Sequence, residues 1–107
     1  MVLNVVPAAP AAILTVVDGP DKGFRFRIKP AASMHIGRET DNDVVLDDPA
    51  TSRHHAEVVF RDGSYVVTDL RSANGTFVND QRVGERPLTD GDQIRIGQNV
   101  IRISIVP

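Results

Sequence analysis

The sequence contains no cysteine among its 107 residues. This absence excludes a disulfide scaffold, a thiol nucleophile and a zinc site with thiolate ligands. The longest apolar stretch, residues 8–17, is interrupted by Pro10 and Thr15, whereas a membrane-spanning helix needs roughly 20 apolar residues. No lysine or arginine precedes Lys22, so the basic start of a secretory signal is also missing. These absences predict a soluble, cytoplasmic chain.

The charge balance is close to neutral and slightly acidic. Lysine and arginine together number 12, aspartate and glutamate 14, and the formal net charge is −2. A protein that binds duplex nucleic acid needs a basic face to displace counterions, so this balance argues against that function. It does not exclude a small local basic pocket. Hydrophobic residues make up 41% and charged residues 24%, which is typical of a globular domain.

The first dozen residues differ from the rest of the chain. Residues 1–12 are rich in proline and alanine, a composition typical of a leader or linker. We expect residues 13–107 to form a single domain, as the length suggests.

The remainder shows the patterns of strands and turns. Residues 24–28 and 101–105 alternate apolar and polar side chains, which places one set on a buried face and the other in water. Asp62-Gly63, between two apolar runs, predicts a tight hairpin. Turn signals recur every 8 to 12 residues or so, and no long helical pattern occurs. We predict an all-β fold, a two-sheet antiparallel β-sandwich of about ten or eleven short strands. The expected strands lie near residues 13–18, 24–28, 33–36, 43–46, 55–60, 64–69, 76–78, 82–83, 93–96 and 100–105.

Three short motifs combine turn residues with polar side chains. Gly37-Arg38 directly follows one expected strand, residues 52–55 (Ser-Arg-His-His) precede another, and residues 72–76 (Ser-Ala-Asn-Gly-Thr) connect two more. Loops of a sandwich cluster at its two ends, where binding sites are commonly found.

The ordered set of motifs resembles the forkhead-associated (FHA) domain. The family pattern is Gly-Arg, then Ser-Arg-x-His, then a turn with Asn-Gly, each in a loop between strands. The resemblance covers about residues 13–106. It implies a module that binds a phosphothreonine peptide through the loops at one end of the sandwich, and not an enzyme.

The resemblance implies that Arg38, Ser52 and Arg53 bind the phosphate. Phosphothreonine carries about −1.5 to −2 charges near neutral pH and three strong acceptor oxygens. Arg38 can present a planar fork of donors, Ser52 a compact hydroxyl and Arg53 a second positive charge.

The remaining motif residues have different implied roles. Asn74 has an amide that can bond the peptide backbone beside the phosphothreonine. Gly37 and Gly75 shape their loops, and His55 braces the structure without touching phosphate.

The implied peptide selectivity depends on residues near the same loops. The family reads mainly the third residue after the phosphothreonine, and the candidates here are Ala50, Thr51, Arg71 and Ala73. Some relatives carry, at the position of Ala73, a threonine that also touches phosphate, and some carry asparagine at the position of Arg53. The direction of the selectivity stays open.

Other interpretations of the same residues remain. Asn74-Gly75 alone fits a type I′ hairpin. Ser52 with a histidine and an aspartate suggests a catalytic triad, but a triad is recognised by geometry. His54 and His55 suggest a metal site, yet neighbours on a strand point to opposite faces.

The expected partner is a protein phosphorylated on threonine by a Ser/Thr kinase. We expect no nucleic acid, no membrane insertion, no cofactor and no metal. The oligomeric state stays open, with a monomer favoured. The alternative function is a phosphate-independent scaffold or oligomerisation domain. Five acidic residues between positions 39 and 48 would repel a phosphate if they faced it, so we expect some of them to brace turns.

Overall fold

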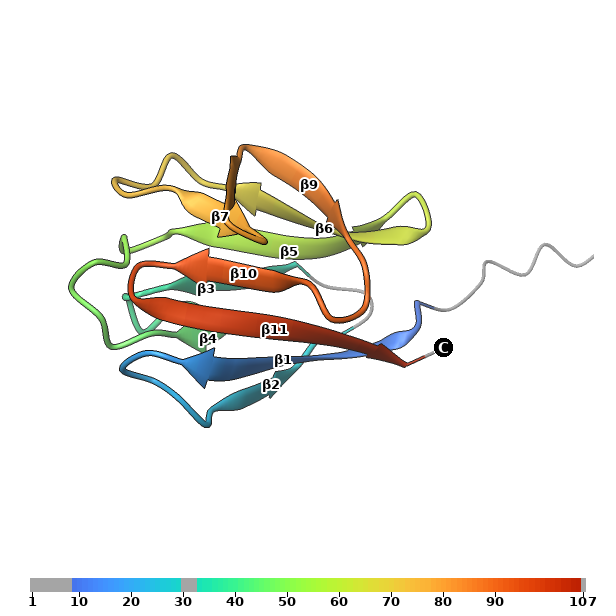
Figure 1. The fold of residues 1–107 in the computed structure, drawn as a ribbon, viewed down its shortest axis with the longest axis horizontal. Helices are drawn as coiled ribbons and strands as arrows, with labels where there is room; N and C mark the ends of the chain where they lie inside the picture. Colours follow the sequence, from blue (N-terminus) through green and yellow to red (C-terminus); the bar gives the residue numbers. More distant parts are fainter. Residues whose placement is uncertain (1–8, 30–32, 107) are drawn as a thin grey trace, which may run out of the picture.

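The computed structural model describes residues 9–29 and 33–106, and within them the chain forms strands joined by turns (Figure 1). Most of the leader expected over residues 1–12 lies outside the described residues. The first strand begins at residue 11, two residues before the expected start. No helix long enough and apolar enough to span a bilayer occurs in the described part of the chain. The described strands are β1 (Ala11–Asp18), β2 (Arg25–Arg27), β3 (Met34–Gly37), β4 (Val44–Val45), β5 (Ala56–Arg61), β6 (Ser64–Asp69), β7 (Thr76–Val78), β8 (Gln81–Val83), β9 (Glu85–Leu88), β10 (Gln93–Ile96) and β11 (Asn99–Val106).

The strands form two sheets that pack face to face. One has six strands in the order β2-β1-β11-β10-β7-β8, and the other has five in the order β4-β3-β5-β6-β9. The predicted all-β sandwich is confirmed. One pair departs from the antiparallel pattern, because β3 and β4 run parallel. With only two residues in β4, the sequence carries no alternation from which its direction could be predicted.

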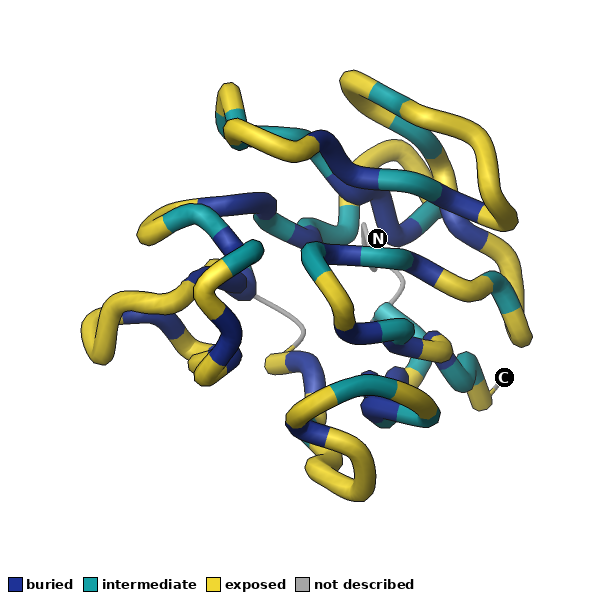
Figure 2. The backbone as a smooth tube through the Cα atoms, turned by 60° about the vertical axis from the view of Figure 1, so that its left-hand side comes forward, coloured by how far each residue is buried: buried dark blue, intermediate teal, exposed yellow. Residues whose placement is uncertain are grey.

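The core lies between the two sheets and follows the period of two. In β1, Leu14 and Val16 are buried while their neighbours are only partly so, and Ile101 and Ile103 of β11 pair with them in register. Figure 2 shows buried stretches along the strands and exposed loops at their ends. Each fully buried aliphatic side chain contributes about 1.5–3 kcal/mol. The core therefore supplies the stability, and the loops are free to carry polar groups.

The sequence patterns did not predict strand β9. It contains Pro87, which lacks the N–H that a sheet ladder uses. The structure places β9 at the edge of the five-stranded sheet, paired on one side only, to β6. Leu88 is buried in the core. A proline is tolerated at an edge because one side of the strand needs no partner.

The Asp62-Gly63 hairpin is confirmed. Both residues adopt positive φ angles, 53° and 82°, between the paired strands β5 and β6. Positive φ at both central positions is the requirement of a type I′ turn.

Candidate functional site

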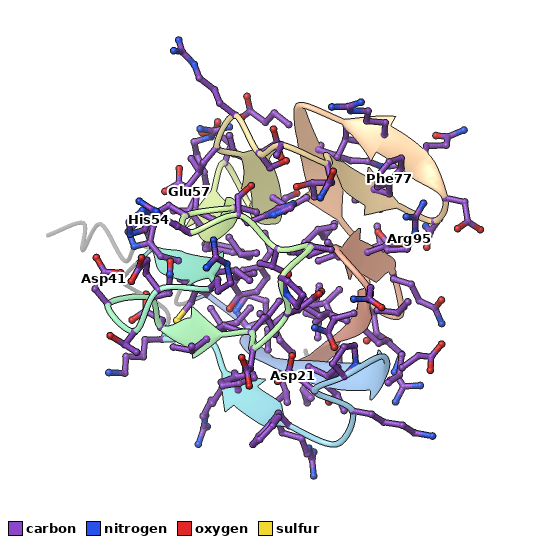
Figure 3. The ribbon with its side chains drawn as sticks, turned by 90° about the vertical axis from the view of Figure 1, so that its left-hand side faces the viewer. Asp21, Asp41, His54, Glu57, Phe77 and Arg95 are labelled. Atoms are coloured by element: carbon purple, nitrogen blue, oxygen red, sulfur yellow. The ribbon has the colours of Figure 1, made fainter. Side chains whose placement is uncertain are left out.

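Three loops meet at one end of the sandwich, on the left of Figure 1 and toward the viewer in Figure 3. They are residues 38–43 between β3 and β4, residues 46–55 between β4 and β5, and residues 70–75 between β6 and β7. Each carries one of the three sequence motifs. The fold thus brings together residues that are up to 37 positions apart, as in the span from Arg38 to Gly75.

Arg38 is exposed and fastened to the second loop. Its backbone N–H donates to the Ser52 carbonyl over 3.1 Å, and its side-chain Nε donates to the Thr51 carbonyl over 3.1 Å. The two terminal guanidinium nitrogens form no hydrogen bond or ion pair with the residues that the structure describes. They keep the planar pair of donors that suits an oxyanion.

Ser52 joins the second loop to the third. Its half-buried hydroxyl oxygen accepts the Ala73 N–H over 2.9 Å. The hydroxyl hydrogen is not used in that bond and can be donated to a ligand. The motif serine is therefore held in place by a backbone group.

Arg53 is exposed, with 73% of its side chain accessible. Its Nε lies 3.7 Å from a Glu39 carboxylate oxygen. Its carbonyl accepts from the Glu39 N–H and from Asn42 Nδ2. Arg53 thus shapes the loops through its backbone, while its charge is partly balanced by Glu39.

Asn74 reaches from the third loop to the second. Its Nδ2 donates to the Ala50 carbonyl over 2.9 Å, and the residue is exposed. The hairpin interpretation of Asn74-Gly75 is wrong, because β6 and β7 belong to different sheets. Only Gly75 of the two adopts a positive φ, at 90°. The amide oxygen and a second N–H hydrogen remain to bond a peptide.

His55 connects the second and third loops beneath the surface. Its side chain is fully buried. Nδ1 accepts the Ser52 N–H over 3.0 Å, and Nε2 lies 2.9 Å from the Gly75 carbonyl. Because Nδ1 accepts, the ring hydrogen lies on Nε2 and is donated to Gly75. The side chain of the neighbouring His54 is 3.0 Å from Asp41. Figure 3 shows His54 and Asp41 next to each other.

The sequence model of the FHA domain matches residues 34–97, more than half of the chain. The chain belongs to the FHA family. The resemblance inferred from the three motifs is confirmed.

Curated relatives of this FHA domain include two bacterial regulators. It is 41% identical over 96 residues to the oxoglutarate dehydrogenase inhibitor of Corynebacterium diphtheriae, covering 89% of this chain and 66% of that one. It is 42% identical to the glycogen accumulation regulator GarA of Mycolicibacterium smegmatis, covering 82% of this chain and 55% of GarA. The FHA domain thus spans between half and two thirds of these relatives.

Solved structures agree with the fold. One, from a study of phosphothreonine-dependent FHA domain interactions, has 35% identity and a TM-score of 0.83, and covers 91% of this chain and 98% of that one. Another is EmbR of Mycobacterium tuberculosis in complex with a low-affinity phosphopeptide. It has 38% identity and a TM-score of 0.80, covering 90% of this chain and 24% of EmbR.

A buried carboxylate fixes the second loop of this FHA domain. Asp48 accepts hydrogen bonds from the Ala50 N–H, the Thr51 hydroxyl and both the backbone and side chain of Gln98. Burial raises the pKa of Asp48, but these hydrogen bonds lower it by more than burial raises it. The pKa of Asp48 is therefore below its usual value. Thr51 is only 1% exposed. The Thr51 side chain therefore stabilises the loop through Asp48 and does not face a bound peptide. Thr51 was expected to help select the peptide, and its burial does not fit that role.

A second carboxylate, missed by the sequence analysis, fixes the third loop. Asp69 accepts from the Ser72 N–H and hydroxyl and from the Thr76 hydroxyl, while the Ser72 hydroxyl oxygen accepts the Gly75 N–H. Burial raises the pKa of Asp69, but the bonds from Ser72 and Thr76 lower it more. An aspartate three residues before a serine at a turn is the signal that was available.

Four of the five acidic residues between positions 39 and 48 have local partners: Asp48 as described above, and Glu39, Asp41 and Asp43. Glu39 lies by Arg53 and Asp41 by His54, while Asp43 accepts the His35 N–H over 2.8 Å. As expected, some of these acids brace turns. The other selectivity candidates differ in exposure: Arg71 and Ala73 are exposed, and Ala50 is half-buried.

Proposed function

We propose that this FHA domain binds threonine-phosphorylated segments of other proteins through Arg38, Ser52 and Asn74. The observation that carries the proposal is the mutual fastening of the three loops. Each of these side chains is hydrogen-bonded to a different loop from its own, over 2.9–3.1 Å. A site held in place before binding loses little conformational entropy when the ligand arrives.

Each residue has a separate role in the proposed complex. Arg38 and Ser52 donate to the phosphate oxygens, and Arg53 adds positive charge at the rim. Asn74 bonds the peptide backbone beside the phosphothreonine. Arg71, Ala73 and Ala50 border the peptide and influence its selection.

The remaining motif residues act as positioning residues. His55 holds the Ser52 and Gly75 backbones at a fixed separation. Gly37 allows close approach of the second loop, because a Cβ there would lie 2.8 Å from the Arg53 carbonyl carbon.

The proposed mode of action is docking without catalysis, in the cytoplasm where protein kinases use ATP. Two relatives are named as a regulator and an inhibitor, and docking onto a phosphorylated partner suits such roles. The partner carries a phosphothreonine, and the kinase is the enzyme that makes it.

The test is a degenerate peptide library in phosphothreonine, phosphoserine and unphosphorylated forms. We expect retention of the phosphothreonine form only, with about micromolar affinity, near −8 kcal/mol. Calorimetry with a selected peptide should show at least about a 100-fold loss in Arg38→Ala, since charge-assisted hydrogen bonds contribute about 1.5–3 kcal/mol each.

The matched control is Arg61→Ala, which removes an exposed arginine from β5. It should bind as the unchanged protein does. Equal retention of all three libraries, or full binding by Arg38→Ala, would instead favour the phosphate-independent scaffold.

A further inference from the structure

The outward face of the six-stranded sheet carries five arginines. Strand pairing shows that they share one face. Arg82 of β8 is opposite Phe77 of β7, which is opposite Arg95 of β10. Directly opposed residues point to the same side of a sheet. The complete set is Arg25, Arg27, Arg82, Arg95 and Arg102.

One carboxylate shares this face with the five arginines: Asp18 is opposite Val100, which is opposite Arg95. Within the six strands as the structure describes them, Asp18 at the end of β1 is the one carboxylate. None of the five forms an ion pair with the described residues. A positive face on a chain of net charge −2 attracts anions locally.

The five-stranded sheet provides the contrast. There, the exposed charges are paired across strands, with His35 by Glu57 and Arg61 by Glu85. The arginine face is therefore a property of one sheet and not of the whole surface.

The arginine row begins at the rim of the candidate phosphopeptide site. A Cβ on Gly75 would lie 2.7 Å from Arg82 Nε, so the Arg82 side chain borders the Asn74-Gly75 turn. Next in the row, the Arg95 guanidinium lies 4.1 Å above the centre of the Phe77 ring. Both residues are labelled in Figure 3. Stacking on an aromatic ring fixes the guanidinium plane and leaves its N–H edge free for a carboxylate.

We propose that the row Arg82–Phe77–Arg95 binds an acidic stretch of the phosphorylated partner. The phosphothreonine of that partner would occupy the three loops at the same time. This inference rests on the proposed function. Arg82 and Arg95 lie two strands apart, about 10 Å. An extended peptide advances about 3.3–3.6 Å per residue. Because alternate side chains of an extended peptide share one face, acidic residues two or four positions apart span roughly 7–14 Å and bracket the separation of the two arginines.

A peptide fits this surface better than a larger polyanion does. The row is narrow and continuous with the peptide site, whereas acidic loop residues such as Glu39 and Asp41 surround the same end of the domain. These acids would repel a nucleic acid duplex or an anionic membrane lying across the end.

The test uses one phosphothreonine core peptide that carries a six-residue extension either at its N-terminal end or at its C-terminal end. The extension is rich in glutamate, in glutamine or in lysine. Affinities are measured for the unchanged chain, for the double variant Arg82→Gln/Arg95→Gln and for Arg61→Gln as a matched charge control. We expect a glutamate extension on one side to tighten binding about three- to tenfold over glutamine at low salt, less at high salt. The double variant should lose this gain while binding the core peptide normally, and Arg61→Gln should retain it.

Two outcomes would overturn the inference. One is that the glutamate-rich extension does not tighten binding on either side of the core peptide, or that it tightens binding of the double variant as much as that of the unchanged chain. The other is tighter binding to single-stranded nucleic acid or to anionic phospholipid vesicles that the double variant loses. An NMR titration with the unphosphorylated glutamate peptide separates this inference from the proposed function. Shifts at the Arg82, Phe77 and Arg95 amides would support the acidic-peptide surface even if no phosphopeptide bound.

Discussion

The two ends of the sandwich differ in the kinds of side chain that hold them together. The end with the three motif loops contains the buried polar residues Asn42, Asp48, Thr51 and His55, whose side chains bond the backbone or each other. The opposite end has an open groove of about 520 Å³ whose lining is mainly apolar, including Phe60, Tyr65, Leu88 and Ile105, together with the polar Ser64, Thr89 and Asp90. Apolar packing stabilises without direction, whereas hydrogen bonds fix positions. The polar end therefore has the geometry that a binding site requires.

His55→Ala should have the largest effect on this difference. It leaves a cavity and removes the partners of the Ser52 N–H and the Gly75 carbonyl, at a cost of roughly 3–5 kcal/mol. At the apolar end, Tyr65→Phe removes only the hydroxyl that donates to the Pro10 carbonyl and should cost about 1 kcal/mol. Urea denaturation measures both. An equal loss in the free energy of unfolding in both variants would contradict the idea that directed hydrogen bonds stabilise the motif-loop end more than they stabilise the opposite end.

Gly37→Ala should destabilise the domain by about 1–3 kcal/mol. A Cβ there meets the Arg53 carbonyl and lies 2.8 Å from Asn42 Nδ2, so the first two loops must separate. Gly84 is a suitable control, because a Cβ there meets nothing within 4 Å and its φ is not in the left-handed range. Gly84→Ala should change stability by less than about 0.5 kcal/mol. A loss of stability as large in Gly84→Ala would contradict this explanation.

Acid should weaken the polar end through Asp48 and Asp69. The pKa of each is lowered in the folded state, because hydrogen bonds from Gln98, or from Ser72 and Thr76, outweigh the rise caused by burial. A lowered folded pKa contributes stability above the unfolded value, near 3.8, and that stability is lost as the pH falls through the folded value. The free energy of unfolding should therefore fall as the pH is lowered from about 5 through 3.8 and below. Denaturation at several pH values should show a shallower fall in Asp48→Asn, and an unchanged profile would contradict the assignment.

Ala73→Thr should have the smallest effect. Ala73 is exposed beside Ser52, whose hydroxyl oxygen accepts its N–H. A threonine there adds a donor next to the proposed phosphate position and should tighten phosphopeptide binding about two- to tenfold. Calorimetry against Ala73→Val, which has the same shape without the hydroxyl, isolates the donor. Equal gains in both variants would attribute the effect to packing.

Much of the fold could be predicted because local patterns determine it. Alternation located most strands, and Asp62-Gly63 identified its hairpin. Pro87 argued against a strand at the position of the edge strand β9. The two-residue β4 has no alternation from which its parallel pairing could be predicted. These features depend on which strands become neighbours, and that is decided by the whole chain.

The positions of the candidate site residues in the loops could be predicted, but the contacts between those loops could not. The motifs located Arg38, Ser52 and Asn74, and the loops bring them together. The sequence did not show that Thr51 turns inward to Asp48 or that Asp69 fixes the third loop. Such contacts are made between loops or within turns whose shape is set only after the sheets pack.

The bonds that join the three loops before any ligand arrives also affect the timing of binding. A site that needs no rearrangement is reached at a rate set by diffusion and orientation, and that rate differs little among related ligands. Differences in affinity between phosphorylated targets then appear mainly as differences in how long each stays bound. If Arg38, Ser52 and Asn74 form the proposed site, their hydrogen bonds to neighbouring loops make residence time the quantity by which this domain distinguishes its partners.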